Sequence, residues 1–376
     1  MARLRSIAMA LGMIGTFGLG VPLSLMSQTV TPNSSRGGQP WMATAPAVPE
    51  FIAPATVGEW SKRRLEIRAQ LEVLLGHLPP RPQVPATRTL RRVQHDGYVE
   101  EQIEFDNGAG SAVPGTLLIP HQGPGPMPAV LYCHWHGGQY ESGRKELFQT
   151  NAVPEPPGPT LVRRGFIVLA IDAYCFGDRN GKGPGGPAEK GAAGEMTASK
   201  FQLWMGRCLW GMMVRDDLMA LDYLCSRTEV DTKNIAVTGI SMGATRTWWL
   251  MALDERPKTG IAVGCLTRYQ DLIAAEGLKS HGIYYFVPGM LRHFDTEAVV
   301  ALAAPKPMLF MTGDLDQGSP VTGVRQIEAK VRPIYGLYGR SDAFVNQVHV
   351  GVGHVYTQEM WQRTLAWLDQ ELRSKF

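Results

Sequence analysis

Ser241 lies in a pattern that suits a nucleophile. Residues 235–252, IAVTGISMGATRTWWLMA, read as a short β-branched strand, a serine flanked by glycines and an apolar helix. A G-x-S-x-G nucleophile elbow needs this order, because its serine sits at a sharp, strained turn between strand and helix. Gly239 and Gly243 fit that turn, since a Cβ on either side of the serine would collide with the crossing backbones. Ordinary Gly-Ser turns share the five-residue pattern, and the flanking strand and helix favour the elbow.

A serine nucleophile also needs donors for the negative charge that develops on a carbonyl oxygen. The run Leu131-Tyr-Cys-His-Trp-His-Gly-Gly-Gln139 directly follows a predicted strand, as an H-G-G loop should. We expect the backbone N–H of Gly138 or Gln139 to donate to this oxyanion, with the N–H of Met242 as the second donor.

The side chains of His134 and His136 are interpreted as loop structure rather than as bases. His136 is in addition a predicted substrate contact, because it belongs to the same loop as the expected donors. For the base, His354 in the Gly-rich run 351–357 is favoured. It follows the last predicted strand and precedes the C-terminal helix, so the order serine, acid, histidine is kept. The remaining candidates without this placement are His281, His293 and His349.

An acid that orients this histidine should follow the predicted strand 307–312. The loop Gly313-Asp-Leu-Asp-Gln-Gly-Ser-Pro320 offers two carboxylates, Asp314 and Asp316. Residues i and i+2 of an extended segment face the same way, so alternation does not separate the two. Both therefore stay candidates on spacing alone.

Composition excludes some classes of partner and cofactor. The chain has 376 residues, 44% of them apolar, with 37 Lys and Arg against 34 Asp and Glu, a balance that argues against nucleic acid as the main partner. The five cysteines are an odd number and fall either in or beside apolar strand-like runs or in a helical pattern, so we expect buried thiols and no disulfide framework. None of them has metal-ligand spacing, and no metal or organic cofactor is predicted.

The N-terminus is predicted to be a targeting segment. Arg3 and Arg5 precede the apolar run 7–26, which is typical of a secretory signal. We predict a signal peptide over residues 1–27 and a secreted or periplasmic protein, with an uncleaved membrane anchor as the alternative. Residues 28–54, rich in Ser, Thr, Gly, Pro and Ala, are predicted to form a flexible linker.

The rest of the chain divides into two predicted parts. Residues 55–99 contain an amphipathic helix, with apolar residues at helical spacing from Trp60 to Leu78 and a stop at Pro79-Pro80. Residues 100–376 alternate strands and helices, which predicts a mostly parallel eight-stranded sheet with helices on both faces. The expected strands are 101–105, 116–120, 129–134, 166–172, 235–238, 261–266, 307–312 and 346–350, the first two forming an edge hairpin.

From about Glu100 onward the chain resembles the α/β-hydrolase superfamily, in its dienelactone-hydrolase-like and acetyl-xylan-esterase-like branch. The motifs that carry the resemblance are His136 to Gly138, the runs 206–224 and 230–243, G-x-x-D-x-x-x-P at 313–320, and Gly353-His354. The resemblance implies that Asp316 is the acid of the triad and that Asp314 has a supporting or structural role. Dienelactone hydrolases proper use a cysteine where this chain has Ser241, so their lactone hydrolysis is not expected here.

Two further stretches are predicted to border the substrate. The Gly-rich segment 174–200 follows a strand and is interpreted as a lid, with a solvated loop as the alternative. The run His281 to Phe294 supplies Tyr284 and Tyr285 as predicted substrate contacts. Trp248 and Trp249 are expected to be core residues rather than a carbohydrate platform.

Together these patterns predict a serine hydrolase that cleaves a small-molecule or carbohydrate carboxylic ester through an acyl-enzyme. The same side chains also cleave amides, so a peptidase or amidase is the nearest alternative. A hydrolase-fold protein that binds without turnover is the third, although none of the expected triad members is missing.

Overall fold

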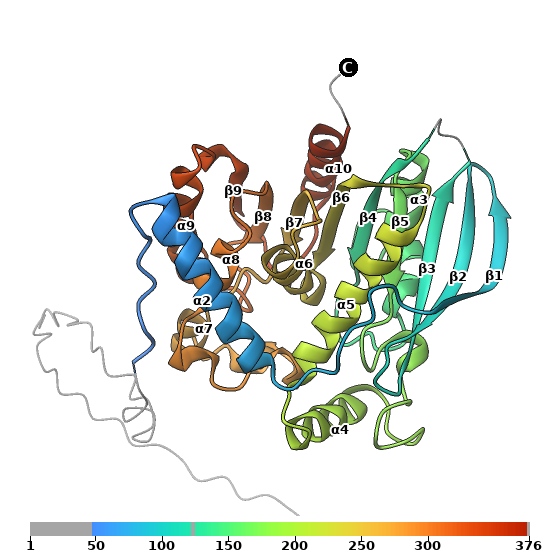
Figure 1. Ribbon diagram of the computed structural model, residues 1–376, viewed down its shortest axis with the longest axis horizontal. Coiled ribbons are helices and arrows are strands. Elements are labelled where there is room, and N and C mark those ends of the chain that lie inside the picture. The colour runs from blue at the N-terminus through green and yellow to red at the C-terminus, as the bar shows by residue number, and fades with distance from the viewer. Residues whose placement is uncertain (1–46, 122–124, 374–376) are drawn as a thin grey trace, which may run out of the picture. The chain divides into compact units, whose positions relative to one another are not determined.

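A nine-stranded sheet runs through the computed structural model (Figure 1). The structure describes residues 47–121 and 125–373. The strands are β1 (Thr87–His95), β2 (Tyr98–Asp106), β3 (Ala112–Pro120), β4 (Met127–Cys133), β5 (Ile167–Ile171), β6 (Val230–Ile240), β7 (Thr259–Val263), β8 (Met308–Gly313) and β9 (Phe344–His349).

The strands lie in the order β1-β2-β3-β5-β4-β6-β7-β8-β9. The pairs from β1 to β5 are antiparallel, and those from β5 through β4 to β9 are parallel. Parallel neighbours need long crossover connections, which here place helices on the sheet faces. The predicted α/β-hydrolase fold with a mostly parallel sheet is thereby confirmed.

The prediction of eight strands was wrong by one, because β1 lies in the part of residues 55–99 after the helix stop at Pro79-Pro80, where no strand was expected. Every side chain of its sequence, TRTLRRVQH, is exposed or half-buried, so it lacks the alternation of a strand with one buried face. Backbone pairing with β2 holds it at the edge of the sheet. The predicted edge hairpin, β2 with β3, is therefore one strand inside that edge.

Helices cover both faces, and alternation along β4 shows why. Val130 and Tyr132 of β4 belong to one core cluster with α3 (Pro157–Arg163) and α10 (Gln358–Leu372). Ala129 and Leu131 face the other way, into a cluster with α5 (Leu209–Ser226). A larger cluster on that second side includes α2 (Val57–Leu75), α6 (Met242–Leu253), α8 (Thr296–Ala301) and α9 (Val321–Leu337).

The expected N-terminal amphipathic helix is α2. Thr56 caps it, because its hydroxyl accepts the Glu59 N–H while the Glu59 carboxylate accepts the Thr56 N–H. The buried residues of α2 are Trp60, Ile67, Leu71 and Leu75. Phe51, within the last part of the expected linker, packs edge-on against Trp60. The rest of that linker and the expected signal segment lie outside the described residues.

Residues 201–225 carry a helical pattern throughout, but the structure has two helices in this region. The chain breaks between α4 (Gly191–Trp204) and α5, where Gly206 has a φ of 72°. Here Arg207 bridges to Gly76 at the end of α2, so closely that a Cβ on Gly76 would lie 2.4 Å from the Arg207 Cα. Segment 174–200, expected to be a lid or loop, thus ends in a helix.

No helix within the described ranges is both long enough and apolar enough to cross a membrane.

The turn from β6 into α6 forces Ser241 into an unusual backbone conformation, with a φ of 59°. A Cβ on Gly239 would lie 2.2 Å from the Cys133 carbonyl oxygen, and one on Gly243 would lie 2.0 Å from it. The steric reason predicted for both glycines is confirmed: the end of β4 passes directly over the turn. Only glycine leaves enough space at these positions.

We expect Gly243→Ala to lower the free energy of unfolding by about 3 kcal/mol, because β4 or α6 must shift to admit the methyl group. Gly353→Ala is the matched control, since its Cβ would meet nothing within 4 Å. Chemical denaturation of both variants measures the difference. Equal stability of the two would contradict the close approach at Cys133.

Candidate active site

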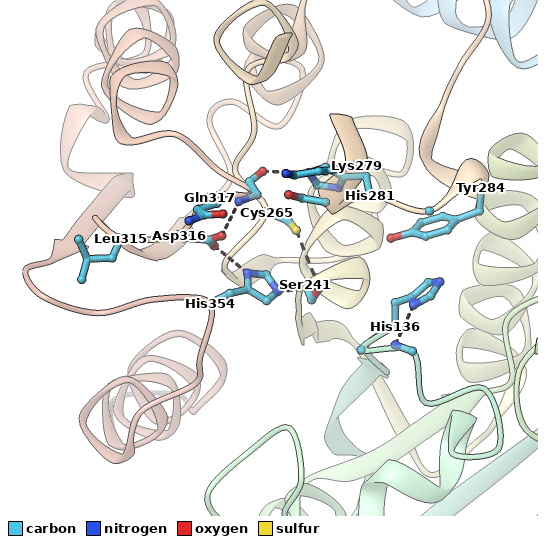
Figure 2. A pocket seen from close by; sticks show the side chains of 15 residues that line it. His136, Ser241, Cys265, Lys279, His281, Tyr284, Leu315, Asp316, Gln317 and His354 are labelled. Atoms are coloured by element: carbon cyan, nitrogen blue, oxygen red, sulfur yellow. Dashed lines mark hydrogen bonds and ion pairs between the residues drawn. The ribbon is translucent and has the colours of Figure 1, made fainter. Parts of the chain in front are cut away.

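Three predicted side chains meet at the carboxyl ends of the parallel strands (Figure 2). The Ser241 Oγ lies 2.9 Å from the His354 Nε2, and the His354 Nδ1 lies 2.7 Å from the Asp316 Oδ2. Asp316 accepts from Nδ1–H, which leaves Nε2 as the acceptor for the Ser241 hydroxyl. The Asp316 side chain is 1% exposed and that of His354 is 35% exposed, so the carboxylate is dry and the imidazole reaches solvent.

The two loops that carry His354 and Asp316 hold each other. Gly313 passes so close to the histidine loop that a Cβ there would lie 2.1 Å from the Val352 carbonyl oxygen. Asp314 accepts the Gly351 N–H at 2.7 Å and so links the loops. Of the two carboxylates that spacing left open, Asp316 faces the imidazole and Asp314 fixes the backbone.

A cavity of about 620 Å³ opens above Ser241. Predicted residues on its wall include His136, Gly138 and Tyr284. Gln139 and Tyr285 are not part of this wall. The Gln139 N–H closes a turn onto the His136 carbonyl oxygen at 2.8 Å, and Tyr285 stacks behind His281.

Within the described ranges, no three His, Cys, Asp or Glu side chains are grouped as metal ligands would be.

Residues 134–138, called the H-x-H-G-G loop from here on, are held in place by their own histidines. His134 is fully buried; it accepts the Ala173 N–H at 3.1 Å and contacts the Trp135 carbonyl oxygen through Nδ1 at 2.8 Å. Burial holds its pKa well below the usual range. Gly138 donates its N–H to the His136 Nδ1 at 3.1 Å. Both imidazoles thus organise the loop.

Glu195 of α4 was missed by the sequence analysis. Its buried carboxylate accepts from the His136 Nε2–H at 2.9 Å and from the Tyr140 hydroxyl at 3.3 Å. The His136 ring is also surrounded by the rings of Tyr140, Phe176 and Tyr284 at centroid distances of 5.0 to 5.1 Å. A single glutamate in a Gly- and Ala-rich segment carries no motif, so only the fold reveals it.

Cys265 is a second residue that the sequence analysis did not place. Its Sγ lies 4.0 Å from the Ser241 Oγ and lines the cavity. Burial, mainly, raises the pKa of this thiol to about 12, so it stays protonated at neutral pH. Because the Cys265 thiol is protonated, Ser241 rather than Cys265 is the candidate nucleophile at this place in the cavity. Trp248 and Trp249, as expected, are buried in the core behind it.

Glu146 supports the strand that enters the H-x-H-G-G loop. Its buried carboxyl group contacts the Tyr132 hydroxyl at 2.6 Å and the Trp135 N–H at 2.9 Å. Burial raises its pKa to about 7, although both hydrogen bonds favour the charged form.

A buried ion pair lies behind the Ser241 turn. Arg246 of α6 donates to both carboxylate oxygens of Asp217 on α5, and the two side chains are 1% and 0% exposed. The pair fixes α6, whose first turn begins directly after Ser241, against α5. A bidentate arginine pair gives this contact a defined orientation.

A family model described as "Abhydrolase family" matches residues 42–323. The chain belongs to this family. "Putative hydrolase YtaP" of Bacillus subtilis is 35% identical over 311 residues, covering 82% of this chain and 100% of that protein.

Solved structures agree on the fold. A "putative acetyl xylan esterase" from Bacteroides fragilis has a TM-score of 0.68 at 18% identity, covering 87% of this chain and 92% of that one. A glucuronoyl esterase from Solibacter usitatus has a TM-score of 0.65 at 17% identity, covering 88% and 100%. At these identities the likeness concerns the fold alone, which is the α/β-hydrolase fold described above.

Glu146 should make the stability of the protein depend on pH. The folded carboxyl group keeps its proton up to about pH 7, whereas its ordinary pKa is 4.5. Between these values the unfolded chain binds fewer protons, so the free energy of unfolding falls as pH rises, by about 3 kcal/mol at most. We expect Glu146→Gln, which cannot ionise, to lose this part of the pH dependence.

Denaturation at about pH 5 and about pH 8 measures the effect. The exposed Glu72→Gln is the control and should follow the original protein at both values. If Glu146→Gln has the same stability as the original protein at both pH values, burial does not raise the pKa of Glu146 as described.

Proposed function

We propose that the protein is a carboxylic ester hydrolase in which Ser241, His354 and Asp316 act as a catalytic triad. The observation that carries the proposal is the continuous hydrogen-bonded chain from the Ser241 Oγ through the His354 imidazole to the Asp316 carboxylate, at the wall of an open cavity. Membership of the Abhydrolase family supports a hydrolytic reaction.

In the proposed reaction His354 takes the hydroxyl proton as Ser241 attacks the ester carbonyl carbon. Asp316 stabilises the imidazolium that forms and keeps the ring in the required tautomer. The imidazolium then protonates the leaving alcohol, and an acyl-enzyme remains. Water, deprotonated by His354, then attacks the acyl carbon; the bond to the Ser241 Oγ breaks, the imidazolium returns the proton to that oxygen, and the acid is released. The partly exposed imidazole lets this water reach it from solvent.

The oxyanion would be stabilised by backbone N–H groups. The Met242 N–H, at the start of α6, is one proposed donor. Gly138 is favoured over Gln139 as the other, because Gly138 lines the cavity and the Gln139 amide is engaged in a turn. In the resting structure the Gly138 N–H is held by His136, so the transition state must draw it away from that acceptor.

The proposed substrate is an acetyl or short-chain ester of a small molecule or a carbohydrate. The proteins of similar fold that are named acetyl xylan esterase and glucuronoyl esterase support the carbohydrate class. An amide substrate is the alternative that the same triad would serve. Residues 1–27 are further proposed to direct the protein to the periplasm or the exterior, on the basis of Arg3, Arg5 and the apolar run after them.

We expect the full chain to hydrolyse p-nitrophenyl acetate, and Ser241→Ala to lower kcat by a factor of about 10⁴ or more. Ser280→Ala is the matched control, since it removes another hydroxyl from the same cavity and should keep most of the activity. Longer p-nitrophenyl esters, acetylated xylan and a peptide amide define the substrate class.

Cleavage of the amide with no ester turnover would replace the esterase by an amidase. No turnover of any of these substrates, or equal losses in both serine variants, would contradict the proposal.

Glu195 is expected to act as a positioning residue for the H-x-H-G-G loop. Glu195→Ala removes the acceptor of the His136 Nε2–H, and we expect kcat for p-nitrophenyl acetate to fall roughly 10- to 100-fold because the loop loses its fixed geometry. KM should change little. Glu195→Gln keeps an acceptor oxygen and should restore most of kcat. If the glutamine variant is as slow as the alanine variant, a hydrogen bond to His136 is not what matters.

A further inference from the structure

A second cavity, here called the α4 cleft, has a volume of about 490 Å³ and shares no wall residue with the cavity above Ser241. It lies between α4, the β2–β3 turn and the segment that follows β5. Helix α4 connects the two places. Glu195 contacts His136 from one end of its buried face, while Gln202, about 10 Å further along the helix axis, lines the α4 cleft.

The wall of the α4 cleft is cationic. Lys182, Arg179 and Arg207 line it, and no Asp or Glu does. Arg179 is neutralised by Asp216, with a distance of 2.9 Å between them. Lys182 and Arg207 have no carboxylate partner within the described part of the chain, and the hydrogen bond of the Arg207 side chain there goes to the Gln202 amide oxygen.

A further buried arginine adds to this charge. Arg215, behind the cleft wall, lies 3.7 Å from Asp216, the carboxylate that already pairs with Arg179, and otherwise donates to three backbone carbonyl oxygens and to the Met219 sulfur. Its pKa is lowered, first by burial and in part by the charges of Arg81 and Arg207. The arginines therefore repel one another across this region, and an anion bound there would relieve the repulsion.

Arg207 is also fixed in place, because its backbone bridges to Gly76 at the end of α2. Beside it, the ring of Phe201 lines the α4 cleft and is 39% exposed. Trp204, one turn further along α4, is 92% exposed. Of the two rings only that of Phe201 is on the cleft wall, where a partly exposed aromatic face beside cations suits a ligand with both polar and apolar faces.

We propose that the α4 cleft binds a carboxylated sugar residue, with its carboxylate on Arg207 and Lys182 and one face of the ring against Phe201. The choice of a sugar rests on the proposed function, in which the substrate class includes carbohydrate esters. The choice of a carboxylate rests on the unpaired cations, which recognise it through charge-assisted hydrogen bonds.

The test is calorimetric titration of sodium glucuronate into the full chain carrying Ser241→Ala, at low ionic strength. We expect binding, and a loss of about tenfold in affinity on adding Arg207→Gln or Lys182→Gln, the factor for one charge-assisted hydrogen bond. Lys200→Gln is the matched control, because Lys200 is an exposed cation of α4 outside the cleft wall. It should bind glucuronate like the parent.

Methyl glucoside carries the sugar ring without the carboxylate, and acetate carries the carboxylate without the ring. Both should bind more weakly than glucuronate. Acetate binding as tightly as glucuronate would overturn the sugar, and methyl glucoside binding as tightly would overturn the carboxylate. Equal affinity in all three glutamine variants would overturn the site. Lys182 is exposed, so its variant should fold whatever the effect of Arg207→Gln.

Failure of this proposal is distinct from failure of the esterase. With Ser241 in place, Arg207→Gln and Lys182→Gln should hydrolyse p-nitrophenyl acetate like the parent, and glucuronate binding does not require turnover.

Discussion

The close passage of backbones around Ser241 is the constraint on which the rest of the site depends. The Cys133 carbonyl oxygen at the end of β4 leaves space only for glycine at 239 and 243. The same passage brings the H-x-H-G-G loop next to the serine, since that loop begins where β4 ends. Gly313 is under the same constraint where the loops of Asp316 and His354 cross, because a Cβ there would collide with the Val352 carbonyl oxygen. Five strand ends, those of β4, β6, β7, β8 and β9, can therefore contribute to one cavity.

Buried carboxyl groups help to give these loops their shape. Loops carry backbone N–H groups that no helix or strand satisfies, and a buried carboxylate can accept several of them. Asp172 does this after β5, where it accepts from Arg144 and from the Asp178 N–H. Glu146 accepts the Trp135 N–H of the H-x-H-G-G loop, whereas Glu195 holds that loop through the side chains of His136 and Tyr140. The polar interior of this region is thus concentrated where the chain is least regular.

The sequence predicted the fold class and the positions of Ser241 and His354. Each of these two residues has a local signal: a short motif with a strand before it and a helix after it. Features set by distant contacts could not be predicted. β1 is a strand only because β2 pairs with it, and the break before α5 exists because α2 ends there. Glu195 has no local signal, since its partner His136 is far along the chain. Asp314 and Asp316 were separable only by resemblance, because their spacing allows either to face inward.

The pair between Arg246 and Asp217 constrains how this family member can change over time. Each charge is almost fully withdrawn from water and has the other as its partner. Replacing one residue alone leaves an unpaired charge in the interior and lowers the free energy of unfolding by on the order of 3 kcal/mol or more. Replacing both by apolar groups of similar volume changes it little. The two positions should therefore vary together among relatives, with intermediates that carry only one of the charges rarely surviving selection.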